Sequence, residues 1–434
     1  MTLSVMLARF IRKQRLTITH YMYFALIVWV LVLVQRHFRH PAVTTIHFVG
    51  TGGDTEGKIT HLVLPSPKKF VAAEAYRALK TVRDNMLKEF IGVDLPPWLD
   101  DPANETQPKL GEILEPRQTR RVIVLTTWRS GSTFLGDLLN AWPGAYYHFE
   151  PLHFLAEREI IPRHQEPLAV GLLKTLLTCH FDQRITPYLY YITSARYNFL
   201  LKKNVRLNSL CRGRGLCQDP GVMATACAFH PLNFAKTVRL RLAAVKSLLE
   251  DTSLDVRVVH LVRDPRGVVN SRLKMPWCSG KTCRDMSNVC RAVNQDAYTS
   301  QEFRSKYPRQ YLLQRYEDLV DDPYRQTRKI FEFLELPLVE ELAAFIEEHM
   351  NTEAKRNERG DDYTYAAQFS TYRNSSSVAT RWRFSLGMQK VQEIQSLCRP
   401  ALRYYGYRSF SEQYQLHNFN MSVIEAQPGR SFLG

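Results

Sequence analysis

The sequence predicts an α/β domain with a parallel central sheet flanked by helices, preceded by one transmembrane helix. Three short runs of strand-forming residues are each followed by a helical pattern, and this alternation is typical of a parallel sheet covered on both faces. An apolar run near the N-terminus, residues 16–34, is long enough to cross a bilayer as a helix.

The apolar run is predicted to be an uncleaved signal anchor. Basic residues are more frequent before it than after it: Arg9, Arg12, Lys13 and Arg15 precede it, and Arg36 and Arg39 follow it. By the positive-inside rule, residues 1–15 form a cytoplasmic tail and the rest of the chain is lumenal. A cleaved signal peptide is the alternative, but the run is long for one and no Ala-x-Ala site follows it closely.

Beyond the anchor, composition divides the chain into three parts. Residues 35–116 contain scattered prolines, a glycine-rich segment and one helical-looking stretch at 70–90, a mixture typical of a stem. Residues 117–410 contain the strand and helix patterns without internal repeats, and we expect them to form one lumenal domain. Residues 411–434 lack periodicity and are interpreted as a C-terminal tail.

Charge and cysteine content indicate which kind of partner the protein binds and in which compartment it folds. The net charge of +16 is spread along 434 residues, which predicts an anionic partner without choosing among nucleic acid, lipid, nucleotide and acidic polysaccharide. Eight cysteines in an oxidising lumen should form disulfides. Cys211/Cys217 and Cys278/Cys283 are plausible local loops, although the connectivity stays open. No Cys-x-x-Cys pair occurs, which disfavours zinc. Three sequons agree with lumenal exposure, at Asn104, Asn374 and Asn420.

The first strand-forming run, residues 121–127, leads into a small, hydroxyl-rich and basic turn. Gly131 allows a ligand to approach the backbone, Ser132 can cap the following helix, and the free N–H groups at that helix start favour an anion. The candidate phosphate-binding residues here are Trp128, Arg129, Ser130, Gly131, Ser132, Thr133 and Phe134. The Walker A spacing is absent. The alternative is an ordinary capped helix with Arg129 in solvent.

The second run, residues 256–262, leads into another basic helix start, and a third run at 311–316 precedes a helical pattern at 323–334. Asp264 and Pro265 are typical of an N-cap and a first helical residue. The candidate binding residues of this segment are Arg263, Asp264, Pro265, Arg266, Gly267, Val268, Val269, Asn270 and Ser271. An arginine at the strand exit can hold phosphate with its planar fork. The alternative is a basic helix end with a structural cap.

Together these segments resemble the Golgi carbohydrate 6-O-sulfotransferases that act on galactose, N-acetylglucosamine and N-acetylgalactosamine. The resemblance covers about residues 120–407 and includes Thr127–Phe134, His148–Leu152, Leu261–Gly267 with Ser271 and Arg272, Arg315–Leu319, Arg381–Trp382 and Gly406–Tyr407. It implies a P-loop-like sulfotransferase fold and 3′-phosphoadenylyl sulfate as donor, with no metal. Thr133 stands where the family often has a second serine, and Trp128 where smaller residues are usual.

The resemblance also implies site roles. Residues 128–134 look like the loop that binds the donor's 5′-phosphosulfate, and Arg263 with Ser271 looks like the 3′-phosphate site. Arg129 is our choice for stabilising the departing phosphate. Glu150 is the favoured general base, with His148 and His153 as the other candidates. The alternative for Glu150 is a structural ion pair with an arginine in the cleft.

These observations predict a single-pass type II Golgi membrane enzyme with a lumenal catalytic domain. It would transfer a sulfuryl group to a sugar hydroxyl in a glycan or proteoglycan and bind no nucleic acid. The resemblance implies the 6-hydroxyl of galactose or an N-acetylhexosamine. The oligomeric state stays open. A Golgi glycosyltransferase is disfavoured because Asp-x-Asp does not occur. A non-enzymatic membrane lectin for acidic glycans would explain the charge but not two phosphate-binding turns.

Overall fold

The structure, a computed structural model, describes residues 72–89, 119–157, 159–211, 215–278, 281–350 and 375–425. The chain divides into two compact units, Met1–Lys69 and Phe70–Gly434, and all described residues belong to the second. The predicted anchor at 16–34 and the sequons at Asn104 and Asn374 lie outside the described residues. Within the described ranges, no helix combines the length and the apolar character needed to span a bilayer.

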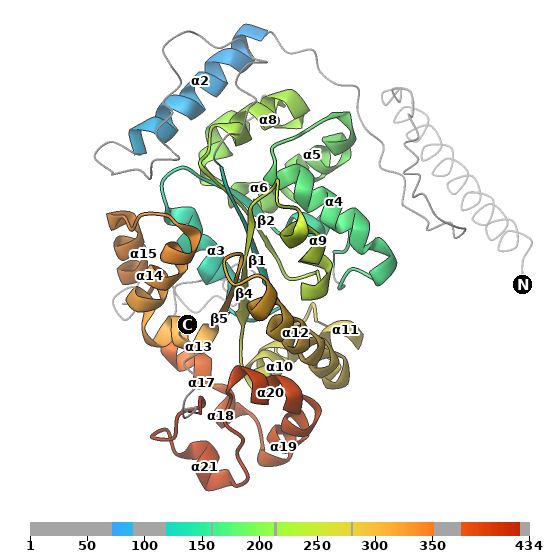
Figure 1. The fold of residues 1–434 in the computed structure, drawn as a ribbon, viewed down its shortest axis with the longest axis vertical. Coiled ribbons are helices and arrows are strands. Elements are labelled where there is room, and N and C mark those ends of the chain that lie inside the picture. The colour runs from blue at the N-terminus through green and yellow to red at the C-terminus, as the bar shows by residue number, and fades with distance from the viewer. Residues whose placement is uncertain are drawn as a thin grey trace, which may run out of the picture. The chain divides into compact units, whose positions relative to one another are not determined.

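A five-stranded parallel sheet forms the centre of the domain, with strand order β2-β3-β1-β4-β5 (Figure 1). The strands are β1 (Arg120–Thr126), β2 (Ala145–Phe149), β3 (Leu232–Thr237), β4 (Val256–Val262) and β5 (Tyr311–Arg315). The predicted parallel sheet is therefore confirmed, and the runs expected at 121–127, 256–262 and 311–316 agree within one residue. We did not predict β2 or β3.

Helices cover both faces of this sheet, as predicted for an α/β fold. Successive residues of β1 point to opposite faces. Val122 and Val124 belong to one hydrophobic cluster with residues of α3 (Ser132–Ala141) and α14 (Pro323–Leu334). Ile123 and Leu125 belong to another, with residues of α4 (Glu166–Leu177) and α9 (Lys246–Glu250). All residues of the central strand except the half-buried Arg121 are consequently buried.

The remaining elements follow the chain order. Before the sheet lies α2 (Ala72–Glu89), close to the expected 70–90. Between β2 and β3 lie η2 (Pro151–Phe154), η3 (Arg163–Gln165), η4 (Gln183–Ile185), α5 (Thr186–Thr193), α6 (Asn198–Lys202), η5 (Val205–Leu207), α7 (Asn208–Cys211), η6 (Leu216–Gln218) and α8 (Pro220–Ala228). Around β4 lie η7 (Leu242–Val245), α10 (Pro265–Leu273), α11 (Lys281–Arg284) and α12 (Met286–Lys306). After β5 lie α13 (Tyr316–Asp321), α15 (Glu340–Met350), α17 (Ser375–Thr380), α18 (Trp382–Ser385), α19 (Met388–Leu397), α20 (Arg399–Tyr405) and α21 (Gln413–His417).

All eight cysteines form disulfides, as expected for a lumenal domain. The bridges are Cys179–Cys227, Cys211–Cys217, Cys278–Cys283 and Cys290–Cys398. The two local loops suggested by the sequence are confirmed. The other two bridges join segments 48 and 108 residues apart, and no local spacing indicated them.

The described part of the predicted C-terminal tail, residues 411–425, packs back onto the domain. It contains α21, and Leu416 is fully buried. The backbone N–H of Arg408 donates to the carbonyl of Val423 at 2.8 Å, and Tyr407 forms an antiparallel bridge with Ile424. This segment therefore adds to the hydrophobic cluster that includes residues of α18, α19 and α20, elements beside which Figure 1 draws α21.

Candidate active site

The turn between β1 and α3 requires a glycine. Gly131 has φ of 86°, and a Cβ added to it would lie 2.3 Å from Cδ2 of Tyr316. Both the left-handed backbone and the missing side chain are therefore needed here. The predicted capping role of Ser132 is wrong: Gly131 is the N-cap, no side chain caps the helix, and Ser132 is already its first residue. The Phe134 N–H donates to the Gly131 carbonyl at 3.1 Å, but a helix start leaves its other first N–H groups without intrahelical acceptors and so still favours an anion.

Trp128, the unusual residue of this turn, is buried beside the disulfide Cys278–Cys283. Its ring lies edge-on to Trp277, with centroids 6.4 Å apart. The guanidinium groups of Arg239 and Arg272 lie 5.6 and 5.7 Å from its centroid. The Trp128 ring thus makes cation–π contacts with two arginines near the turn.

The other residues of the turn divide between polar and core positions. Thr127 and Ser130 share a hydrogen bond of 3.0 Å between their hydroxyls. Phe134 packs in the core, 5.6 Å from the ring of Phe345. Thr133 is half-buried on the first turn of α3.

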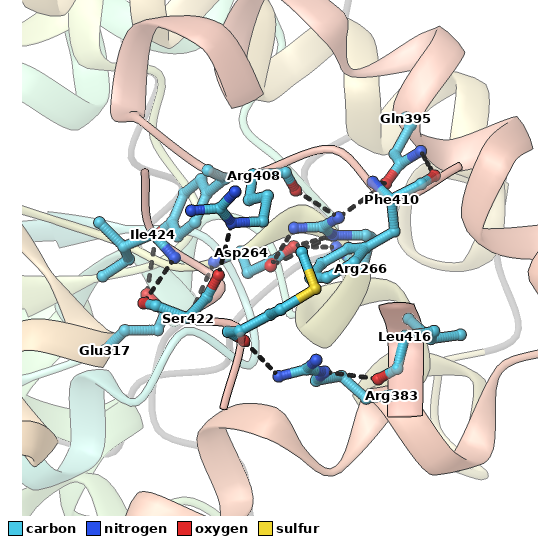
Figure 2. A network of polar contacts seen from close by, with 12 residues as sticks. Asp264, Arg266, Glu317, Arg383, Gln395, Arg408, Phe410, Leu416, Ser422 and Ile424 are labelled. Carbon is cyan, nitrogen blue, oxygen red and sulfur yellow. Dashed lines mark hydrogen bonds and ion pairs between the residues drawn. The ribbon is translucent and has the colours of Figure 1, made fainter. Parts of the chain in front are cut away.

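The second turn begins α10 as predicted. Asp264 is the N-cap and accepts from the backbone N–H of Arg266 at 2.9 Å, and Pro265 is the first helical residue. The Arg266 side chain is fully buried. It bonds to Asp264, to Gln395 Oε1 at 2.7 Å and to the Arg408 carbonyl at 2.8 Å, as Figure 2 shows. The polar contacts of this arginine therefore lie in the interior of the domain.

The remaining residues of α10 support its packing. Val268 and Val269 lie in a hydrophobic cluster with residues of α12, α19 and α20. A Cβ on Gly267 would lie 3.2 Å from Arg263 Nε and from Trp382 Cδ1, so glycine permits their close approach. Asn270 is 8% exposed.

Side chains join the two turns. Arg129 Nε donates to Ser271 Oγ at 3.0 Å. Arg263 Nη1 donates to the carbonyl of Arg129 at 3.0 Å, and its Nη2 donates to Val378 at 2.7 Å. Arg263 Nε is buried, and no acceptor among the described residues faces it. The carboxyl ends of β1 and β4 thus bring two arginines and a hydroxyl together, although the turns are more than 130 residues apart in sequence.

Glu150 lies directly after β2 rather than after the preceding helix, and it is 4% exposed. Its Oε1 accepts from Lys236 Nζ at 2.6 Å, and its Oε2 accepts from Arg239 Nη1. Burial alone would raise the pKa of the Glu150 carboxyl, but the two cations hold it below its ordinary value. Glu150 is therefore ionised at neutral pH, in the ion pair that the alternative interpretation expected.

Sequence reasoning missed Lys236 and Arg239 as site residues. Both occur in the stretch 232–240, which is otherwise mostly apolar, and two bases in a buried strand region were the available signal. Lys236 Nζ also lies 4.5 Å from the ring centroid of Phe149. Burial lowers the pKa of Lys236, and the Glu150 carboxylate opposes that shift.

The two histidines near Glu150 are neutral at pH 7. Burial lowers the pKa of His148 to about 3 and, together with the Arg239 charge, that of His153 to about 4. His153 Nδ1 lies 2.6 Å from the Tyr191 hydroxyl. His148 lines a cavity of about 20 Å³. Such low pKa values make both rings weak bases, and His153 is already engaged with a tyrosine.

The sulfotransferase domain family matches residues 119–406, a range that contains both turns and Glu150. The chain belongs to the sulfotransferase family. This sulfotransferase is similar to carbohydrate sulfotransferase 1 of Mus musculus, with 29% identity over 72% of this chain and 85% of that protein. It is also similar to carbohydrate sulfotransferase 3 of Mus musculus, with 29% identity over 75% and 76%. A sulfotransferase domain from the Synechococcus PCC 7002 olefin synthase covers 67% of this chain and 96% of its own, at 21% identity and a TM-score of 0.38.

The predicted resemblance to the carbohydrate sulfotransferases is confirmed by the family match and these relatives. With it, the prediction of an enzyme that depends on 3′-phosphoadenylyl sulfate is confirmed. The individual site residues of this sulfotransferase stay predictions.

A buried carboxyl supports the second turn of the sulfotransferase. Glu317 Oε1 accepts from the backbone N–H of Asp264 at 3.0 Å, and its Oε2 accepts from the Tyr407 hydroxyl at 2.7 Å. Burial and the nearby Asp264 raise the pKa of Glu317 to about 7. The segment Arg315–Leu319 carried part of the sequence resemblance, but its contact with the helix start of α10 was not foreseen.

Proposed function

We propose that this sulfotransferase moves a sulfuryl group from 3′-phosphoadenylyl sulfate to the 6-hydroxyl of galactose or an N-acetylhexosamine in a glycan or proteoglycan. The hydrogen bond from Arg129 to Ser271 carries the proposal, because it joins two phosphate-type turns at the carboxyl edge of the sheet, where ligands of such sheets bind. The names of the relatives support a carbohydrate acceptor. The 6-position follows from the sequence resemblance.

The residues present fit the chemistry of such a donor. N–H groups at the start of α3 and the Arg129 guanidinium would hold the 5′-phosphosulfate. Arg263 and Ser271 would hold the 3′-phosphate. The buried Nε of Arg263, which has no hydrogen-bond partner among the described residues, supports this assignment. When bound, the donor supplies the sulfuryl group and a phosphate leaving group. Because the Arg266 side chain is buried in the domain, it would act on this site through the position of α10.

Arg129 would stabilise the negative charge that develops on the leaving phosphate, since a fixed cation in a water-poor site acts strongly on such charge. Glu150 would accept the proton of the sugar hydroxyl. Each carboxylate oxygen has two lone pairs, and each uses one for a cation. The other lone pairs are available to the hydroxyl, while Lys236 and Arg239 keep the carboxylate ionised and oriented.

The proposed setting is the Golgi membrane, with residues 1–15 cytoplasmic, 16–34 as the anchor, 35–116 as the stem and the catalytic domain lumenal. The pairing of all eight cysteines supports an oxidising compartment. The apolar run supports the anchor.

Two measurements on the full chain in detergent test the proposal. Calorimetric titration with adenosine 3′,5′-bisphosphate should show binding without added divalent metal. Transfer of labelled sulfate from the donor should occur onto polymers of galactose or N-acetylhexosamine, and not onto polymers whose 6-hydroxyls are blocked. A membrane lectin would bind glycans without the nucleotide, and a glycosyltransferase would consume a sugar nucleotide. Absence of nucleotide binding would overturn the donor assignment.

A further inference from the structure

An exposed aromatic surface, separate from the candidate active site, lies near the C-terminus. Phe384 is 68% exposed and Phe419 is 43% exposed. Their rings stack with centroids 4.5 Å apart at 16°, and the His417 ring lies nearly parallel to Phe384 at 5.9 Å. We call these three residues the aromatic platform.

The platform belongs to a rigid part of the domain. The buried Arg383 donates to the carbonyls of Gln415, Leu416, Asn418 and Met421 at 2.7 to 3.0 Å. Figure 2 shows this arginine beside Leu416. Its guanidinium also lies 4.5 Å from the Phe419 ring centroid. The end of α21, which carries His417, and the turn that carries Phe419 are thus fixed around one cation.

Stacked and exposed aromatic rings indicate a binding surface. Single exposed apolar residues are ordinary on protein surfaces, whereas contiguous apolar patches commonly mark a contact site. A glycan is a suitable occupant, because the C–H face of a sugar ring can lie flat on an aromatic ring while its hydroxyls stay in water. A second copy of the chain and a lipid surface are the other occupants to be tested.

The sequon Asn420-Met421-Ser422 starts directly after Phe419. Asn420 is exposed and lies in a turn, where its backbone N–H donates to Asn418 Oδ1 at 3.1 Å. A sugar attached to its side chain would be held beside the platform, and such tethering raises the effective concentration far above that of a free ligand.

We propose that Asn420 carries an N-linked glycan whose first N-acetylglucosamine lies on the aromatic platform. In the modification, Asn420 Nδ2 bonds to C1 of the sugar and loses one proton to a base of the host's glycosylating enzyme. The bond from C1 to the lipid pyrophosphate donor breaks, and the pyrophosphate leaves with the electron pair. This inference rests on the lumenal orientation and not on the sulfuryl transfer.

Expression of the full chain in a secretory host, followed by glycopeptide mapping, tests the modification. Asn420 should be occupied in the parent and in the matched variant Tyr298→Ser, and the glycan should be lost in Asn420→Gln. Ser422→Ala is less suitable alone, because Ser422 Oγ accepts from the backbone N–H of Ile424 at 3.1 Å. An unmodified Asn420, in protein that reaches the secretory pathway, would overturn the proposal.

Thermal unfolding tests the contact with the platform. Trimming the glycan to its first sugar should leave the midpoint of unfolding unchanged, whereas Asn420→Gln should lower it by about 2–4 °C, the shift that corresponds to about 1 kcal/mol. In a Phe384→Ser background, the same Asn420→Gln change should have no further effect. In Tyr298→Ser, a control of similar exposure, the shift should persist. If Asn420→Gln lowered the unfolding midpoint equally in the Phe384→Ser and Tyr298→Ser backgrounds, the proposed contact would be overturned.

Chain association is measured on the same samples, and lipid binding is measured on anchor-deleted protein. If chain association, measured by sedimentation, depends on Phe384, the platform binds a second copy of the chain. If anchor-deleted protein with unmodified Asn420 floats with phosphatidylcholine vesicles and this flotation depends on Phe384, the platform binds lipid. Either result would overturn the proposal. Sulfate transfer is assayed in parallel. Its absence from protein that carries the Asn420 glycan would count against the proposed function and leave the glycan contact standing.

Discussion

Arg129 and Ser271 are joined by a hydrogen bond of 3.0 Å from Nε to Oγ, across 142 positions of the sequence. The contact links the turn after β1 to the helix after β4. It brings the group proposed to stabilise the leaving phosphate next to the group proposed to bind the 3′-phosphate. One change should therefore affect both ends of the donor.

Loss of donor contacts is the first expected outcome. Ser271→Ala and Arg263→Ala should each weaken binding of adenosine 3′,5′-bisphosphate by about tenfold to a hundredfold, since a hydrogen bond to a charged group contributes about 1.5–3 kcal/mol. Arg129→Ala should lower both affinity and turnover. The Arg129/Ser271 double variant should be less impaired than the sum, because the two side chains touch. Arg325→Ala, a change at an exposed position, is the control. If calorimetry gave all three single variants the nucleotide affinity of the parent, the donor assignment would be contradicted.

Proton abstraction is the second point. Glu150→Gln should reduce sulfate transfer by about a hundredfold to ten-thousandfold while nucleotide affinity stays near that of the parent. Because this change leaves the buried Lys236 without its carboxylate, the double variant Glu150→Gln/Lys236→Met is needed. If Glu150 is the base, the double variant stays inactive although part of its stability recovers; Arg239 still lacks its carboxylate partner. Recovery of transfer in the double variant would show that Glu150 only balances charge, and His148 and His153 would be tested next.

Two glycines should respond in opposite ways to alanine. Gly131→Ala forces a Cβ into the Tyr316 ring at positive φ, so it should lower stability by more than 1 kcal/mol, about the cost of the left-handed backbone alone, and abolish nucleotide binding. Gly171 is an exposed residue of α4 with nothing within 4 Å of an added Cβ. Its change to alanine should raise stability by about 0.5–1 kcal/mol. Urea unfolding of both variants measures the difference.

The raised pKa of Glu317 predicts a pH dependence. Its ordinary pKa is 4.5 and its folded pKa is about 7, so between these values the folded protein retains a proton that the unfolded chain releases. Stability should fall as pH rises through this window and level off above it. Glu317→Gln should remove this contribution. The unfolding free energy of the variant should therefore increase relative to that of the parent as pH rises from 4.5 to 7. Parallel pH curves would contradict the raised pKa.

The disulfides should differ in their effect on stability. Replacing both Cys290 and Cys398 with alanine opens a loop of 108 residues, whereas replacing Cys278 and Cys283 opens one of 5. In the chain-entropy account, the losses are about 5 and about 2 kcal/mol. Nonreducing peptide mapping should first find all four bridges, and denaturant unfolding then compares the two variants. Alkylation of all eight thiols without reduction would contradict the lumenal topology.

The sequence alone determined the elements whose signals are local. The strand at 256–262 is rich in Val and Leu, the start of α10 is marked by Asp264 and Pro265, and α14 begins at a proline and carries an amphipathic pattern. Each signal acts within one or two turns of chain, so it could be interpreted without knowing the neighbours. The family resemblance followed from such segments and their order.

The tertiary structure alone decided β2, β3 and the environment of Glu150. Asn233 and Lys236 make β3 look too polar for a buried strand, but Asn233 Nδ2 donates to the Leu176 carbonyl at 2.9 Å and Lys236 pairs with Glu150. The parallel register places Phe149 opposite Lys236, which brings the following Glu150 within reach of that lysine. Burial of these charges depends on partners from distant segments, and the register of a sheet is set by the packing of the whole domain rather than by any local pattern.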